Sequence, residues 1–253
     1  MADAVDPLFE FALRMGDNCL ILGQNVSAWC GHAPVLEEDI AMANTGLDLI
    51  GQTKMWLTLA GEVRGDGRSA DDLAFLRDAR AYRNCLLVEQ PNGDYGQTLM
   101  RQFLFDAWHH PMLEGLQASS NARVAEIAEK AVKEAAYHLE RSTDLVIRLG
   151  DGALESNRRM QAALDALWPF VGELTSEDDV EIQLAAAGSI PAAAEVEAVY
   201  RQYAGRVFSE AMLRAPEDAF MRTGGKDGRH TEALGYILAE MQFLQRAYPN
   251  ATW

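Results

Sequence analysis

The chain has 253 residues, 49% hydrophobic and 24% charged, a composition typical of a globular protein rather than a disordered or fibrous one. Its 38 acidic and 22 basic residues give a formal net charge of −16, which disfavours nucleic acid and anionic membranes as partners. Three widely spaced cysteines, an acidic start and the lack of any apolar run near the ~18 residues of a membrane span predict a cytoplasmic protein.

Helical periodicity recurs along the chain and strand signals are weak, so we expect an all-α protein. Asp6-Pro7 has the form of a helix start, and Pro111 is expected to bend or break the helix that contains it. No internal repeat or linker is visible, which predicts a single domain over residues 1–253. In chain order, helices are predicted over about residues 7–29, 35–63, 71–80, 95–116, 119–150, 155–171, 192–213 and 231–247.

Two of these helices have a clear apolar face. In the second, the apolar positions recur every three or four residues and predict burial between several neighbours: Leu36, Ile40, Ala43, Leu47, Ile50 and Leu57, widened by Leu49 and Trp56. In the helix over residues 119–150, the predicted inward stripe is Val124, Ile127, Ala131, Ala135, His138, Ser142, Leu145 and Leu149. Four long helices followed by C-terminal ones predict a ferritin-like bundle with additional C-terminal helices.

Bundles of this type often hold two irons between carboxylates and Glu-x-x-His boxes, because residues i and i+3 share one helical face. None of the five histidines of this chain has a glutamate three positions before it. Asp106 precedes His109 and Asp227 precedes His230 at that spacing, but aspartate is shorter and the second pair lies in a glycine-rich stretch. We therefore interpret both histidines as hydrogen-bonded or solvated rather than as metal ligands.

Several sequence blocks give the chain a resemblance to the C subunits of multicomponent phenylacetyl-CoA ring 1,2-epoxidases. They extend from one end of the chain to the other: Gly16–Leu20, Trp29–Pro34, Gly46–Gln52, Val88–Gly93, Arg222–Lys226 and Ala239–Gln242. The resemblance implies an oxygenase complex in which a homologous A subunit holds the di-iron centre. It also implies a separate NADPH-dependent reductase and a small bridging subunit.

Comparison with the iron-binding helices of that A subunit, matched through Ala33-Pro34-x-Leu36, shows where its ligands would fall. Only two of the matched positions, Asp106 and His138, still carry a metal-binding side chain. The matched positions are Cys19, Leu49, Gln52, Asp106, Ala135 and His138. The resemblance therefore implies no catalytic residue and no metal in this chain, with the di-iron centre in the partner.

A buried acid without a metal needs a proton or a cation. We therefore expect a hydrogen-bonded core network that includes a nearby Lys or Arg and replaces the metal as a structural tie. The candidate members are Asp48, Gln52, Asp106, Glu134 and His138. For the individual residues we prefer the simpler interpretation, in which Glu134 points to solvent and His138 is a satisfied core histidine.

Two further features are open to a binding role. Arg222, Lys226 and Arg229 concentrate positive charge in an acidic protein and could contact a carboxylate-rich partner or a phosphate of coenzyme A. Trp253 could dock onto the bundle or a partner. The function we predict is a non-catalytic structural subunit that stabilises the A subunit. The alternatives are a di-iron oxygenase in its own right and an independent helical acyl-CoA-binding protein.

Overall fold

The computed structural model describes residues 6–249 and residue 251, so the predicted docking of Trp253 lies outside the described residues. The described chain is helical and contains no strand, which confirms the all-α prediction and is consistent with a ferritin-like helical bundle. It forms two compact units: the chain up to Glu89 joins the chain from Gly224 onward, and Gln90–Thr223 forms the other. The single domain predicted from the sequence stays a prediction.

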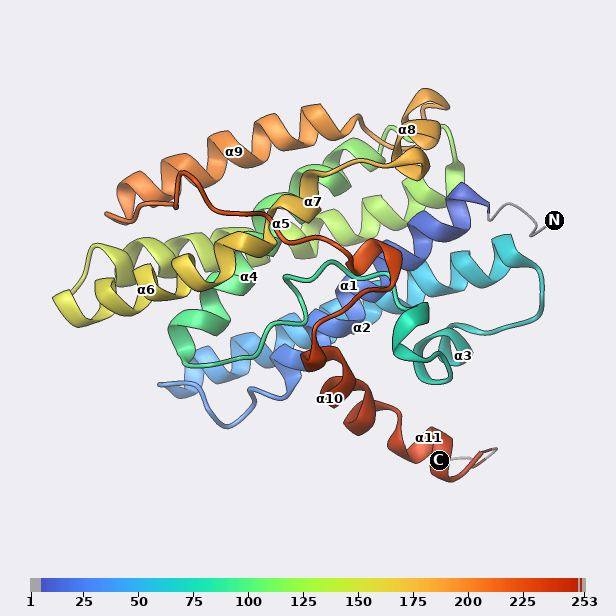
Figure 1. Ribbon diagram of the computed structural model, residues 1–253, viewed down its shortest axis with the longest axis horizontal. Coiled ribbons are helices and arrows are strands. Elements are labelled where there is room, and N and C mark those ends of the chain that lie inside the picture. The colour runs from blue at the N-terminus through green and yellow to red at the C-terminus, as the bar shows by residue number, and fades with distance from the viewer. Residues whose placement is uncertain (1–5, 250, 252–253) are drawn as a thin grey trace. The chain divides into compact units, whose positions relative to one another are not determined.

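The first unit is built on a pair of long helices, α1 and α2, which lie side by side (Figure 1). Segments from both ends of the chain complete it. Its elements are α1 (Pro7–Ser27), α2 (Leu36–Arg64), α3 (Ala70–Phe75), η1 (Ala79–Ala81), η3 (Gly225–Asp227), α10 (Glu232–Met241) and α11 (Phe243–Ala247).

The second unit is built on the long helices α4 and α5, and α6 and α9 pack against them. Its elements are α4 (Tyr95–Leu116), α5 (Ala122–Gly150), α6 (Leu154–Leu167), η2 (Trp168–Phe170), α7 (Gly172–Thr175), α8 (Asp179–Ala186) and α9 (Ala193–Glu210). Among the described residues, no helix combines the length and the apolar character that a membrane crossing requires.

Local capping chemistry sets several helix starts. The Asp6 carboxylate accepts the backbone N–H of Leu8 at 2.8 Å, and Pro7 occupies the first turn of α1, as the sequence predicted. Asp178 and Glu181 form a capping box at the start of α8. No helix was predicted between residues 171 and 192, so α8 was missed.

Helix α4 is continuous through Pro111, so the helix does not break at this residue, and the expected bend stays a prediction. Proline inside a helix removes one backbone hydrogen bond and costs about 3 kcal/mol. Pro111, Met112 and Leu113 are all buried in the last part of α4. Burial of this apolar segment offsets the loss of the hydrogen bond.

The predicted inward face is confirmed along most of α5, where the stripe is buried from Val124 to Ser142. The prediction for α2 is wrong in part. Leu49, Trp56 and Leu57 are buried, but Leu36 and Leu47 are each 70% exposed and Ile40 is 53% exposed. The periodicity identified the apolar positions of α2 but could not show which of them are buried and which are exposed.

Candidate functional site

The six positions matched to metal ligands lie on four long helices, and all six side chains are buried. Cys19 on α1 and Leu49 and Gln52 on α2 belong to the first unit. The second unit holds the other three, Asp106 on α4 and Ala135 and His138 on α5. Each unit therefore contains half of the matched positions.

In the first unit, two of the three matched residues contact each other through polar atoms. The Cys19 thiol donates to Gln52 Oε1 at 3.7 Å, and both side chains are fully buried. Leu49, one turn before Gln52 on the same helix, is also fully buried. A protonated thiol, an amide and a hydrocarbon supply no anionic ligand, whereas iron sites of this type need carboxylate oxygen.

In the second unit, Asp106 is the centre of a small polar cluster. Its carboxylate accepts hydrogen bonds from Gln102 Nε2 at 2.7 Å and from Ser142 Oγ at 2.9 Å. Burial raises the pKa of Asp106 to about 6, although the positive charge of His138 and the two hydrogen bonds act in the opposite direction. Asp106 and His138 are both buried, and their membership of one network stays a prediction.

The other members of the predicted network are divided between the two units. Asp48 on α2 is half-buried and belongs to the first unit, and Glu134 on α5 is half-buried in the second. Gln52 is engaged with Cys19. The sequence had placed all of these residues together with Asp106 and His138 in one core network.

His109 is a buried histidine in an aromatic environment. Its ring lies 4.8 Å from the Phe105 ring and 6.0 Å from the Trp108 ring, measured between centroids. Neither ring nitrogen has a hydrogen-bond partner among the described residues. Burial, and secondarily the charge of His138, lowers the pKa of His109 to about 3, so the ring is neutral at ordinary pH.

The residues present do not fit a di-iron centre. Leu49 and Ala135 place buried hydrocarbon at two positions where charge-neutralising oxygen is required. Across the described part of the chain, no group of three or more His, Cys, Asp or Glu side chains is arranged to hold a metal ion. Hydrogen bonds are present at these positions instead, from Cys19 to Gln52 and from Gln102 and Ser142 to Asp106.

His230, read in the sequence as a possible aspartate-type box with Asp227, has a different partner. Its Nδ1 lies 2.8 Å from Glu89 Oε2, and its Nε2 lies 3.1 Å from the carbonyl oxygen of Tyr82. Both neighbours are acceptors, so both ring nitrogens donate when the imidazole is protonated. The buried Glu89 also accepts the backbone N–H of Thr231 at 2.6 Å, and the pair therefore fastens the C-terminal segment to the first unit.

The three cations proposed for anion contact are divided between the two units. The Arg222 guanidinium lies over the Phe170 ring at 5.3 Å in the second unit. Arg229, in the first unit, forms an exposed ion pair with Asp227 at 2.8 Å. Lys226 lies in η3 of the same unit. Anion contact by these residues stays a prediction.

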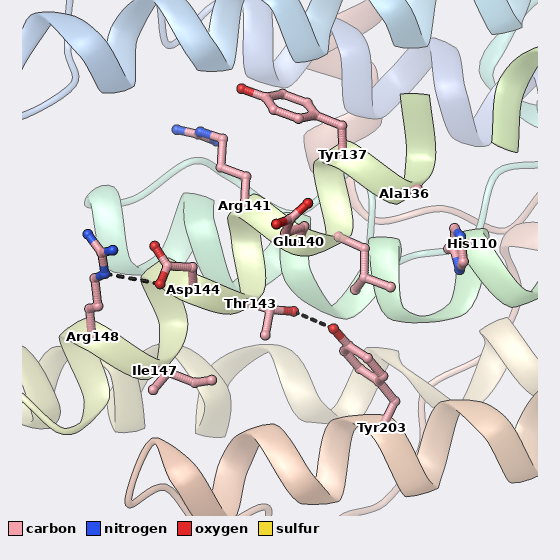
Figure 2. A pocket seen from close by; sticks show the side chains of 11 residues that line it. His110, Ala136, Tyr137, Glu140, Arg141, Thr143, Asp144, Ile147, Arg148 and Tyr203 are labelled. Atoms are coloured by element: carbon pink, nitrogen blue, oxygen red, sulfur yellow. Dashed lines mark hydrogen bonds and ion pairs between the residues drawn. The ribbon is translucent and has the colours of Figure 1, made fainter. Parts of the chain in front are cut away.

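The second unit also carries an open groove of about 750 Å³ along α5, which the sequence did not indicate (Figure 2). Tyr203 of α9 faces Thr143 across it, and their hydroxyl oxygens lie 3.0 Å apart. Arg148 pairs with Asp144 at 3.0 Å on the rim. Other ionisable side chains that line the groove include His110, Glu140 and Arg141.

Comparisons with known proteins agree with the residue pattern. Residues 1–253 match the family model described as "Phenylacetic acid catabolic protein". The sequence is also 45% identical over 249 residues to a protein of Escherichia coli (strain K12) that is named as the C subunit of 1,2-phenylacetyl-CoA epoxidase. That similarity covers 98% of this chain and 100% of the E. coli protein.

Proposed function

Because the chain belongs to the phenylacetic acid catabolic protein family over its whole length, we propose that it is the C subunit of a phenylacetyl-CoA epoxidase. In this role the chain is a non-catalytic scaffold that pairs with a homologous di-iron A subunit and stabilises it. Dioxygen and reducing equivalents from an NADPH-dependent reductase are used at the A subunit. The proposal places the complex in the cytoplasm, in keeping with three free cysteines.

The observation that best supports the proposal is the chemistry of the side chains at the six positions matched to metal ligands. Leu49 and Ala135 are buried and apolar, and Cys19 and Gln52 satisfy each other. The remaining pair, Asp106 and His138, supplies too few donors for two irons. A helical scaffold with these substitutions can support a partner but cannot itself activate dioxygen.

The resemblance also supports specific partners. The E. coli relative is named as a subunit, which implies an assembly for that protein. For this chain we propose the A subunit as the direct partner and the small bridging subunit as a further component of the complex. Duplicated helical chains present complementary faces to one another, which favours a helix-on-helix interface.

Co-expression of this chain with the A subunit tests the proposal. We expect the two chains to copurify as a stable complex, and we expect phenylacetyl-CoA epoxidation by the A chain to require this chain. Failure of the chains to associate would overturn the pairing. Tight binding of phenylacetyl-CoA by this chain alone, without any partner, would favour an independent acyl-CoA carrier.

A further inference from the structure

Helix α2 uses one of its faces to pack closely against α1. A Cβ atom added at Gly16 on α1 would lie 2.6 Å from Leu57 Cδ2, and one added at Gly46 on α2 would lie 2.7 Å from Ser27 Oγ. Both distances are shorter than van der Waals contact, so the two glycines allow the helices to approach. The fixed α1 contact determines which face of α2 points away from the unit.

That other face carries an exposed row of residues, here named the α2 stripe: Leu36, Ile40, Asn44, Leu47 and Gly51. Leu36 and Leu47 are each 70% exposed, and Ile40 is 53% exposed. A monomeric protein seldom exposes several large apolar side chains on one helix face, and such a group marks an interaction surface.

The spacing of the stripe defines the shape of its occupant. Its members follow one another at four, four, three and four residues, so they lie along one face of the helix. The stripe extends about 22 Å along α2 at 1.5 Å per residue. A Cβ added at Gly51 would meet nothing within 4 Å, so a partner backbone can approach there. These features fit another α-helix of at least four turns.

The charges beside the stripe define the chemistry of the occupant. Glu37, Glu38 and Asp48 flank it, and α2 contains no lysine or arginine before Lys54. A partner helix with an apolar seam and flanking Lys or Arg side chains would complement this rim. A second copy of the chain laid on the same stripe would bring acidic rims and two net charges of −16 together, which disfavours self-pairing.

We infer that the α2 stripe is the surface onto which a helix of the homologous A subunit packs, with its apolar seam on Leu36, Ile40 and Leu47 and its basic side chains against the acidic rim. This inference rests on the function proposed above and adds the location of the interface. It also accounts for the exposure of Leu36, Ile40 and Leu47 on α2.

The test compares two leucine-to-aspartate substitutions at exposed positions. Leu47→Asp changes the centre of the stripe, and Leu154→Asp changes a leucine that is 92% exposed on α6 of the second unit. We expect Leu47→Asp to weaken the complex with the purified A chain by at least about 100-fold in Kd, because a buried apolar anchor is replaced by a charge. Leu154→Asp and the conservative Leu47→Met should bind like the wild type.

Each outcome has a distinct meaning. Thermal melting of the isolated variants checks that Leu47→Asp folds, as expected for an exposed position. If the wild type binds the A chain and Leu47→Asp binds equally well, the inference is overturned and the proposed function stands. If the wild type does not bind, the proposed function itself fails. If the isolated wild type forms a dimer that Leu47→Asp abolishes, a second copy occupies the stripe and the inference is likewise overturned.

Discussion

Asp17 of α1 and Arg77, which follows α3, form a two-point ion pair inside the first unit. Arg77 Nη1 donates to Asp17 Oδ2 at 2.9 Å, and Nη2 donates to Oδ1. The backbone N–H of Arg83 adds a third hydrogen bond to Asp17 at 2.8 Å. Both side chains are buried, so the pair holds the 77–83 segment against α1 without help from solvent.

Asp17→Ala should destabilise the protein strongly. The substitution leaves the Arg77 guanidinium buried without its counter-charge, and breaking a buried pair in this way costs about 3–5 kcal/mol. Urea unfolding at neutral pH measures the change in the free energy of unfolding. Asp66→Ala, which removes an exposed partner of Arg68, serves as the control and should leave the unfolding midpoint nearly unchanged. Equal effects of the two substitutions would contradict the structure.

Asp106 makes a contribution to stability that depends on pH. Its pKa is raised from 3.8 to about 6 in the folded protein, chiefly by burial. The folded state therefore binds more protons than the unfolded state between these values. The resulting stabilisation is complete below about pH 3.8 and is lost as the pH rises through about 6, a change of about 3 kcal/mol.

Asp106→Asn removes this titration. The free energy of unfolding of the variant, relative to that of the wild type, should therefore be higher at pH 8 than at pH 4. Urea unfolding of both proteins across this range measures the difference. A difference between wild type and variant that does not change with pH would show that Asp106 does not retain its proton in the fold.

The contribution of His109 to stability should depend on pH in the opposite direction. Its pKa falls from 6.5 to about 3 on folding, chiefly because of burial, so the unfolded chain binds more protons between these values. The stability associated with the neutral ring is complete above pH 6.5 and is lost as the pH falls towards 3, by up to about 5 kcal/mol.

His109→Phe keeps an aromatic ring beside Phe105 and Trp108 and cannot be protonated. The variant should gain stability relative to the wild type as the pH falls from 7 to 4. Chemical unfolding at several pH values provides the comparison, and parallel curves for the two proteins would disprove this role of His109.

The Glu89–His230 contact should control how firmly the C-terminal segment is held. Glu89→Gln removes the charge that His230 faces at 2.8 Å and weakens the acceptor of the Thr231 N–H group. We expect faster amide hydrogen exchange in α10 and earlier proteolysis near Gly224, because local opening of this segment becomes easier. Arg229→Ala removes only an exposed ion pair nearby and should leave exchange in α10 unaffected.

Sequence periodicity predicted the helices and the inner face of α5 well, because the spacing of apolar residues reflects burial within a helix pair. The same reasoning was wrong for Leu36 and Leu47, since periodicity identifies an apolar face without identifying what covers it. Contacts between distant residues were not predictable. Glu89 and His230 are 141 positions apart, and no local motif connects them.

The altered ligand positions were found only through a residue-by-residue resemblance, because Leu49 and Ala135 look like ordinary core residues. The structure adds what the sequence could not, namely the partners of Cys19 and Asp106. Blocks such as Gly16–Leu20 and Val88–Gly93 also carry structural roles, since they include the buried acids Asp17 and Glu89.

Iron analysis of the separated subunits tests the central claim most directly. After copurification with the A chain and separation under iron-retaining conditions, we predict that the metal remains with the A chain and that this chain carries none in stoichiometric amount. The isolated chain should then consume no dioxygen with phenylacetyl-CoA and a reductant. Two irons per molecule of this chain, with substrate oxidation in the absence of the A chain, would contradict the account.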